Sequence, residues 1–247
     1  MKIKAGQKLI DKIRGKKKHN KNNIKDIWGR TIYSQDGEDV VLYSYIMNGK
    51  SSDYKGFFVD VGALRPQRYS NTFIFYKMGW NGINIDGTPG SMAKFNEERP
   101  RDINIEAVVS DNNSEKVSYY IFEESALNCF NKECAEAYIS EGWKLNNIVQ
   151  LQPKTINDIL DTYVPKNKKI DFINIDTEGI DEKIVKSINY EKYAPDYFII
   201  EECDFINKDF AQYKELSNIY KFLYLKNYIV VGKTMRSIIY KKIERRI

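Results

Sequence analysis

The chain has 247 residues, of which 42% are hydrophobic and 30% are charged. This composition is typical of a globular protein with room for one substantial α/β domain, and no apolar run approaches the ~18–20 residues of a membrane-spanning helix. The start lacks the apolar core of a secretory signal. Three scattered cysteines without CxxC spacing argue against a disulfide framework or a structural zinc site, so we expect a cytoplasmic protein.

The net charge of +5 is unevenly distributed. Residues 1–30 contain eleven Lys or Arg against two Asp, whereas residues 31–247 carry a net charge of −4. We therefore expect a basic arm over residues 1–30 and one domain over residues 31–247, with no nucleic-acid partner for the domain. The arm is either a solvated tail or a segment that docks on the inner face of the membrane, an anionic carrier or another subunit. The sequence indicates no oligomeric state.

Strands and helices alternate from Thr31 onward. Strands are predicted at residues 57–61, 82–86, 105–110, 117–122, 170–176, 196–201, 228–232 and 237–242. Helices are predicted at residues 37–47, 71–79, 90–98, 155–163 and 182–188. This order predicts an α/β fold: a mostly parallel central sheet with helices on both faces. The last two strands are predicted to form an antiparallel hairpin at its edge.

Carboxylates lie at three predicted strand ends, namely Asp60, Asp86 and Asp176. Asp86 follows Asp60 by one strand-helix-strand unit, so both should face one crevice, where an acidic residue can hold the two hydroxyls of a ribose. Gly62 and Ala63 would let the backbone approach a ligand closely. Each Asp could instead cap a helix or start a turn. Because no GxGxxG loop is present, a nicotinamide enzyme is the weaker alternative and S-adenosylmethionine is favoured as cofactor.

Five ordered blocks carry a family resemblance: "TIYSQDGEDVVL" (31–42), "GFFVDVGALRPQRYSNTFIFYKMGWNGINID" (56–86), "ALNCF" (126–130), "TINDIL" (155–160) and "IDFINIDTEGIDEKIVKSI" (170–188). Together they resemble the FkbM family of methyltransferases, from about Thr31 to the C-terminal hairpin. The resemblance implies a class I, Rossmann-like fold that binds S-adenosylmethionine. It also implies O-methylation, often of sugars in polysaccharides or natural products.

The resemblance implies roles for individual residues. Those expected to contact the cofactor are Asp60, Gly62 and Ala63 at its methionine part, Asp86 and Gly87 at its ribose, Ser110 and Asp111 at its adenine, and also Gln35 and Asn71. Ser34, Gln35 and Glu38 belong to a leading block expected to close over the cofactor, although Ser34 or Asp36 could simply cap a helix. The turn "GALRP" departs from the GAN-D-G type of many relatives, and its proline restricts Leu64 and Arg65.

Carboxylates are the expected catalytic groups, because the single histidine, His19, lies in the arm. Asp176 and Glu178 in "NIDTEG" are the predicted bases for removing the proton of an acceptor hydroxyl. Asp176 with Glu202 of "IIEECD" could alternatively hold Mg²⁺ or Mn²⁺, which bind oxygen ligands. Helix capping by Glu178 remains open.

Two residues are predicted to contact the substrate, Arg68 as the partner of an anionic group and Asn128 as the partner of a hydroxyl or phosphate. The expected function is O-methylation of a sugar, as a nucleotide sugar or a precursor of a capsular or lipopolysaccharide surface polymer. The alternatives are a lipid, small-metabolite or protein acceptor, or a scaffold that binds a nucleoside without catalysis.

Overall fold

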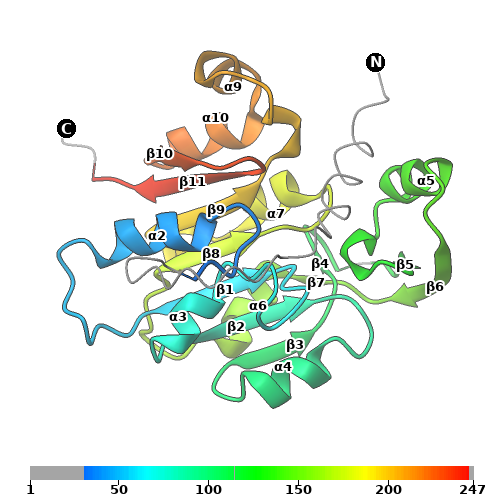
Figure 1. Ribbon diagram of the computed structural model, residues 1–247, viewed down its shortest axis with the longest axis horizontal. Coiled ribbons are helices and arrows are strands. Elements are labelled where there is room, and N and C mark those ends of the chain that lie inside the picture. The colour runs from blue at the N-terminus through cyan, green and yellow to red at the C-terminus, as the bar shows by residue number, and fades with distance from the viewer. Residues whose placement is uncertain (1–30, 114, 245–247) are drawn as a thin grey trace, which may run out of the picture.

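A seven-stranded sheet forms the centre of the computed structural model, which describes residues 31–113 and 115–244 (Figure 1). The predicted arm over residues 1–30 lies outside the described residues. Within the described ranges, no helix is long and apolar enough to cross a membrane.

The sheet has the strand order β10-β11-β9-β8-β1-β2-β3. Its strands are β1 (Phe57–Val61), β2 (Asn81–Asp86), β3 (Ile103–Glu106), β8 (Phe172–Ile175), β9 (Tyr197–Glu201), β10 (Tyr228–Lys233) and β11 (Ser237–Lys242). The five strands from β9 to β3 are parallel, and β11 is antiparallel to both β9 and β10. The predicted mostly parallel sheet with an antiparallel hairpin at its edge is confirmed. Since β2 and β8 flank β1 on opposite sides, the strand order reverses there, where α/β sheets bind ligands.

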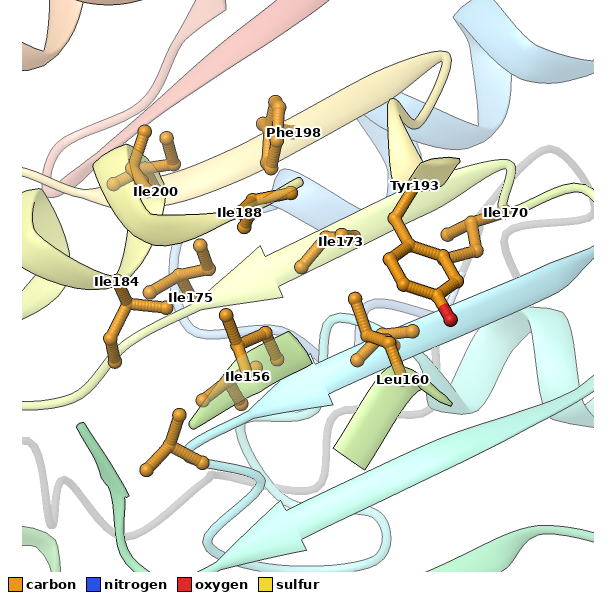
Figure 2. Close-up of a cluster of buried hydrophobic side chains, with 14 of the residues drawn as sticks. Ile156, Leu160, Ile170, Ile173, Ile175, Ile184, Ile188, Tyr193, Phe198 and Ile200 are labelled. Atoms are coloured by element: carbon orange, nitrogen blue, oxygen red, sulfur yellow. The ribbon is translucent and has the colours of Figure 1, made fainter. Parts of the chain in front are cut away.

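Helices cover both faces of this sheet because successive side chains of a buried strand point to opposite faces. The helices beside the sheet are α2 (Glu38–Met47), α3 (Phe73–Lys77), α4 (Met92–Glu98), α6 (Ile156–Tyr163), α7 (Asp181–Ser187), α8 (Tyr190–Tyr193), α9 (Phe210–Leu216) and α10 (Asn218–Leu225). Phe57 and Val59 of β1 pack in the larger core, to which α6 and α7 contribute isoleucines (Figure 2). Phe58 packs on the opposite face with residues of α2 and α3.

Residues 117–151 form a separate unit beside the sheet (Figure 1). Its antiparallel ribbon pairs β5 (Val117–Phe122) with β6 (Leu145–Leu151), and η1 (Ser125–Leu127) and α5 (Lys132–Ser140) connect the two strands. The predicted strand at 117–122 therefore exists but does not join the central sheet. The strand predicted at 105–110 is split, because its last two residues form β4 (Val109–Ser110), which pairs with β7 (Lys154–Thr155).

A row of buried polar side chains crosses four parallel strands. Asn174, Asp60, Asn84 and Asn104 are register partners on β8, β1, β2 and β3. Asn174 donates to Asp60 (2.8 Å), and Asn84 donates to Asn104 (2.8 Å). Buried polar groups are stable only when they are hydrogen-bonded, so this row fixes the register of the four strands at their carboxyl ends.

Arg99, which is fully buried, supplies the positive charge beside this row. Its Nε donates to Asp102 (2.7 Å), and one terminal nitrogen donates to Thr72 Oγ1 (2.9 Å) and to the Pro66 carbonyl (3.2 Å). Thr72 in turn donates to Asp60 (2.8 Å). Burial raises the pKa of Asp60, and the nearby Arg99 charge opposes that shift. The guanidinium thus joins the strand row to the loop that follows β1.

Substitution of Arg99 tests this network. Arg99→Met leaves Asp102 as a buried carboxylate without its cation, so we expect the free energy of unfolding to fall by about 3–5 kcal/mol in urea titrations. Lys132→Met, which removes an exposed ion pair to Glu136, is the matched control and should change it by less than about 1 kcal/mol. Equal losses in the two variants would contradict the structural role of Arg99.

Candidate functional site

Two pockets adjoin at the carboxyl edge of the parallel strands. The first pocket, of about 630 Å³ including space open to solvent, extends from β1 and β2 to the β5–β6 unit. The second, which we call the acidic pocket, has about 500 Å³ on the same measure and lies between the β1 and β8 ends and residues 35–38. Gly62, Leu64 and Asp176 line both pockets, so a ligand in one can reach the other past these residues.

Asp86 lies in the first pocket at the end of β2, whereas Asp60 lines the acidic pocket, so the two carboxylates do not face one crevice as predicted. The Asp86 carboxylate accepts the backbone N–H groups of Thr88 (2.8 Å) and Leu64 (3.1 Å). Burial raises the pKa of Asp86, and these hydrogen bonds lower it. A carboxylate held by two amides keeps lone pairs for a ligand, so Asp86 can accept hydrogen bonds from a diol.

The turn after β1 brings the backbone unusually close to β8. Gly62 has φ +86°, and a Cβ there would lie 1.8 Å from the Asp176 carbonyl oxygen. Leu64 also has a positive φ of 50°, in a region where leucine is uncommon and asparagine is tolerated. This is the position at which "GALRP" departs from its relatives, and the Leu64 N–H to Asp86 holds the turn in place. The turn therefore carries local strain next to the pocket.

Gly87 is closely packed in the wall of the first pocket. A Cβ at Gly87 would lie 2.8 Å from Val108 Cγ2 and 3.1 Å from the Tyr119 ring, so no larger residue fits. Ala107, Val108 and Val109 line the pocket here. Ser110 and Asp111, predicted to hold adenine, are not among its lining residues: Ser110 pairs with Thr155 in the β4–β7 ladder and donates to Asp111. Because β3 ends at Glu106, the pocket wall is formed instead by the three residues before Ser110, namely Ala107, Val108 and Val109.

Asn128 lies in this same pocket, on the side of Asp86. Its amide donates to Thr88 Oγ1 (2.9 Å) and accepts the Phe122 N–H (2.8 Å), which ties the β5–β6 unit to the end of β2. Neighbouring Cys129 also lines the pocket, and burial raises its pKa to about 12. That thiol stays protonated near neutral pH, so a thiolate nucleophile is not available here.

The acidic pocket has an excess of carboxylates. Its charged lining residues are Asp36, Glu38, Asp60, Asp176, Glu201 and Arg236. Gln35, Ala63 and Asn71, all predicted cofactor contacts, line it as well. Asn71 donates to Asn174 (2.9 Å), and its buried Oδ1 has no hydrogen-bond partner. A carbonyl oxygen left in this state is an acceptor that a bound ligand can satisfy.

Three of the carboxylates at these pockets gather closely enough to act together. One oxygen each of Asp176, Glu178 and Glu201 lies within 4.8 Å of the others. Glu178 has a positive φ of 54° and accepts a hydrogen bond from Tyr138 of α5 (2.8 Å). The two residues predicted as bases are thus together, and the third member comes from the end of β9.

That third member is Glu201, whereas Glu202 was predicted as the metal ligand beside Asp176. Glu202 points to the opposite face of β9, where its carboxylate accepts hydrogen bonds from Tyr213 (2.7 Å), Ser217 (2.7 Å) and Tyr240 (2.8 Å). Side chains along β9 alternate between the two faces of the sheet, with Ile200 in the larger core and Ile199 on the α2 face. Glu202 therefore shares the side of Ile200, and Glu201 shares the side of Ile199.

Arg236 is a pocket residue that the sequence reasoning missed. It lies at the end of the β10–β11 turn, where one terminal nitrogen donates to both carboxylate oxygens of Asp36 (2.6 and 2.8 Å), and Thr234 of the same turn donates to Glu38 (2.6 Å). These contacts fasten residues 35–38 over the acidic pocket, so Asp36 is not a helix cap. Ser34 instead accepts the Gly37 N–H (3.1 Å) at the start of α2.

Arg68, predicted to contact substrate, lies outside the lining of both pockets. It is exposed, and its guanidinium lies 4.3 Å from the Tyr69 ring centroid. Tyr69 lines the acidic pocket, so Arg68 is one residue removed from it. The neighbouring Arg65 instead donates to Ser125 (3.1 Å) at the rim of the first pocket.

A model of the "Methyltransferase FkbM domain" matches residues 60–230, which is more than half of the chain. The chain belongs to the FkbM methyltransferase family. The matched span contains Gly62, Asp86 and Glu201. The pocket residues Gln35, Asp36 and Arg236 lie outside it. Comparison with curated protein sequences found no significant relative.

Several solved methyltransferase structures resemble the fold at low identity. Monomeric WbdD has 9% identity and a TM-score of 0.44, with 83% of this chain and 40% of that one covered. Methyltransferase FkbM from Methylobacillus flagellatus KT has 12% identity and a TM-score of 0.40, with 76% and 44% covered. The N-terminal domain of human METTL16 in complex with SAH has 10% identity and a TM-score of 0.39, with 83% and 68% covered. The chain spans less than half the length of the first two.

The close approach at Gly62 can be tested against a glycine of similar backbone. Gly49 has φ +77° with open space around its Cβ position, so Gly49→Ala adds only the cost of a left-handed residue, about 1–2 kcal/mol. Gly62→Ala adds a clash with the Asp176 carbonyl, and we expect it to destabilise the fold by about 1–3 kcal/mol more. Urea unfolding of both variants measures the difference, and similar losses would contradict the close approach.

A double-mutant cycle tests the fastening of residues 35–38. For Asp36→Asn, Arg236→Met and the double variant, we expect a coupling energy of about 1–3 kcal/mol in urea unfolding, because the charged pair is largely buried. The matched control is the cycle for Lys186 and Glu182, an exposed pair with the same 2.6 Å separation, which should give less than about 0.5 kcal/mol. A coupling at Asp36 no larger than the control would show that this pair does not hold the segment.

Proposed function

We propose that the protein transfers the methyl group of S-adenosylmethionine to a hydroxyl of a sugar, presented as a nucleotide sugar or as a precursor of a surface polysaccharide. One observation carries the proposal: a pocket suited to a nucleoside meets a pocket rich in carboxylates at Gly62 and Asp176. Membership of a methyltransferase family supports the reaction class. The cytoplasm is the proposed location, as the sequence suggests.

The first pocket fits the adenosine part of this cofactor. Asp86 offers acceptor lone pairs for the two ribose hydroxyls, and Ala107, Val108 and Val109 give the pocket an apolar wall against which an adenine ring could pack. Gly62 lines both pockets, so the chain that links the ribose to the methionine part would pass beside its backbone. The unpartnered Asn71 oxygen in the acidic pocket can accept from the ammonium group of that part.

The bound cofactor would supply an electrophilic methyl group on a sulfonium. Asp176 or Glu178, whose carboxylates lie near each other, would take the proton from the acceptor hydroxyl as its oxygen bonds to the methyl carbon. The electron pair of the broken C–S bond then stays on sulfur. Residues 35–38, fastened by Arg236, cover the acidic pocket and limit water access during this step.

The chemistry of the acidic pocket favours a sugar as acceptor. Gln35 and Asn71 offer amides, Tyr69 a phenol and Asp176 a carboxylate, and such groups can hydrogen-bond several hydroxyls at once. The same set disfavours a nucleic acid, since carboxylates repel phosphates. A lipid-linked sugar also satisfies this chemistry, which keeps a lipid acceptor as the second candidate.

The group formed by Asp176, Glu178 and Glu201 also fits a divalent metal by its chemistry. Three carboxylate oxygens are ligands that Mg²⁺ and Mn²⁺ prefer, and such a metal would acidify an acceptor diol. We include this ion in the proposal as an optional part. If it takes part, EDTA will abolish transfer and Mn²⁺ or Mg²⁺ will restore it.

Paired variants test the assignment of the two pockets. Asp86→Asn should weaken S-adenosylmethionine binding about tenfold in calorimetry, because one of two ribose acceptors is lost. Asp176→Asn should keep that binding within about threefold but lower transfer of labelled methyl to nucleotide sugars at least about a hundredfold. Asp111→Asn, outside both pockets, is the control and should change neither.

The same measurements separate the alternatives. Cofactor binding with no transfer to any nucleotide sugar, with or without metal, would reject the acceptor class and favour the lipid-linked candidate or another one. Binding that is unaffected by Asp86→Asn would reject the cofactor assignment. A wild-type protein that binds but transfers nothing to any acceptor would be a nucleoside-binding scaffold.

A further inference from the structure

Half of the exposed large apolar side chains in the described part of the chain lie within twenty residues. Five of ten come from α9, α10 and the start of β10: Phe210, Leu216, Tyr224, Leu225 and Ile229. Leu225 has the highest exposed fraction of the ten, at 76%. Figure 1 shows these elements beside the β10–β11 edge of the sheet, away from the β5–β6 unit. We call them the α9–α10 surface.

Ring contacts show that this surface is continuous. The Phe210 and Tyr220 centroids are 6.5 Å apart, and the Tyr220 and Tyr224 rings stack at 5.9 Å, which joins the two helices. Lys221, Tyr224 and Leu225 share one side of α10 by their three- and four-residue spacing. Its buried residues, Ile219 and Leu223, pack into the larger core on the other side.

Basic residues surround these apolar side chains. Residues 208–233 contain five lysines against Asp209 and Glu215, a net charge of +3, although residues 31–247 as a whole carry −4. Lys214 lies 4.6 Å from the Phe210 ring centroid. Among the described residues, none of the five lysines forms a salt bridge with a carboxylate. The lysines are Lys208, Lys214, Lys221, Lys226 and Lys233.

We propose that the α9–α10 surface docks on an anionic lipid membrane. Leu225, Tyr224 and Phe210 would enter the interface between headgroups and acyl chains, and the lysines would contact lipid phosphates. Charge selects this partner over a second copy of the chain, since a two-fold symmetric contact would bring the same lysines face to face. This surface is distinct from the N-terminal arm, whose sequence contributes charge at the other end of the chain.

The docking surface packs on the face of the sheet opposite Glu201. Tyr213 stacks on Phe210 (6.0 Å between centroids) and donates to Glu202, which follows Glu201 in the chain but lies on the other face of the sheet. Docking would bring the protein to the membrane, where a lipid-linked sugar is presented. This second step rests on the proposed function, whereas the docking itself does not.

Vesicle flotation of the full chain tests the docking without any activity readout. Leu225→Glu places a charge at the most exposed apolar position, so we expect at least about a tenfold loss of binding to phosphatidylcholine vesicles that contain phosphatidylserine. The matched control is Ile148→Glu on β6, where the native side chain is 48% exposed, and its binding should equal that of the wild type. Measurement at high salt screens the contribution of the basic arm.

Three results would overturn the docking. Wild-type protein could lose all binding at high salt, which screens the arm and the α9–α10 lysines alike, and this would show that the apolar side chains add no affinity. Leu225→Glu and Ile148→Glu could behave alike. Wild type could form dimers that Leu225→Glu dissociates, with vesicle binding unchanged in both, which would make the surface a protein interface. Circular dichroism melts check folding, and Tyr224→Ser is a milder second variant that should lower binding in the same direction.

Discussion

The polar row across β8, β1, β2 and β3 is the constraint on which the rest of the site depends. Four parallel strands place three asparagines and a carboxylate in one line, where Asn174 is hydrogen-bonded to Asp60 and Asn84 to Asn104, whereas the buried Asn84 Oδ1 has no partner. Arg99 supplies the charge that makes Asp60 tolerable there. Because the row lies at the carboxyl ends of the strands, any slip in register would disturb both pockets at once.

The same network explains how a strained turn survives beside the pockets. Arg99 holds the Pro66 carbonyl and Thr72, which both lie in the segment that follows the turn containing Leu64. With that segment fixed, Leu64 keeps a positive φ and directs its N–H to Asp86. Asp86 therefore accepts a hydrogen bond from the turn whose sequence departs from the family pattern. Pro66 at the end of this turn restricts the backbone conformations of its neighbours, so fewer of them have to be excluded by the surrounding contacts.

Sequence reasoning succeeded where one periodicity or one spacing decided the outcome. The β1 and β11 strands begin and end as predicted, and the 26-residue interval correctly placed Asp86 on the strand beside Asp60. It failed where long-range packing decides. Alternation along β9 could have selected Glu201 over Glu202, but nothing local indicates that Tyr213, Ser217 and Tyr240 surround Glu202, or that Arg236 reaches Asp36 across two hundred residues.

The position of β11 between β9 and β10 has a consequence for how the site is made. As the chain leaves the ribosome, β1, β2, β8 and β9 and the first pocket can form before residue 236 has been synthesised. Until then β9 is an open edge strand, and residues 35–38 have no partner at the acidic pocket. The ion pair that fastens residues 35–38 at the acidic pocket thus requires almost the whole chain, whereas the strands that form the first pocket do not.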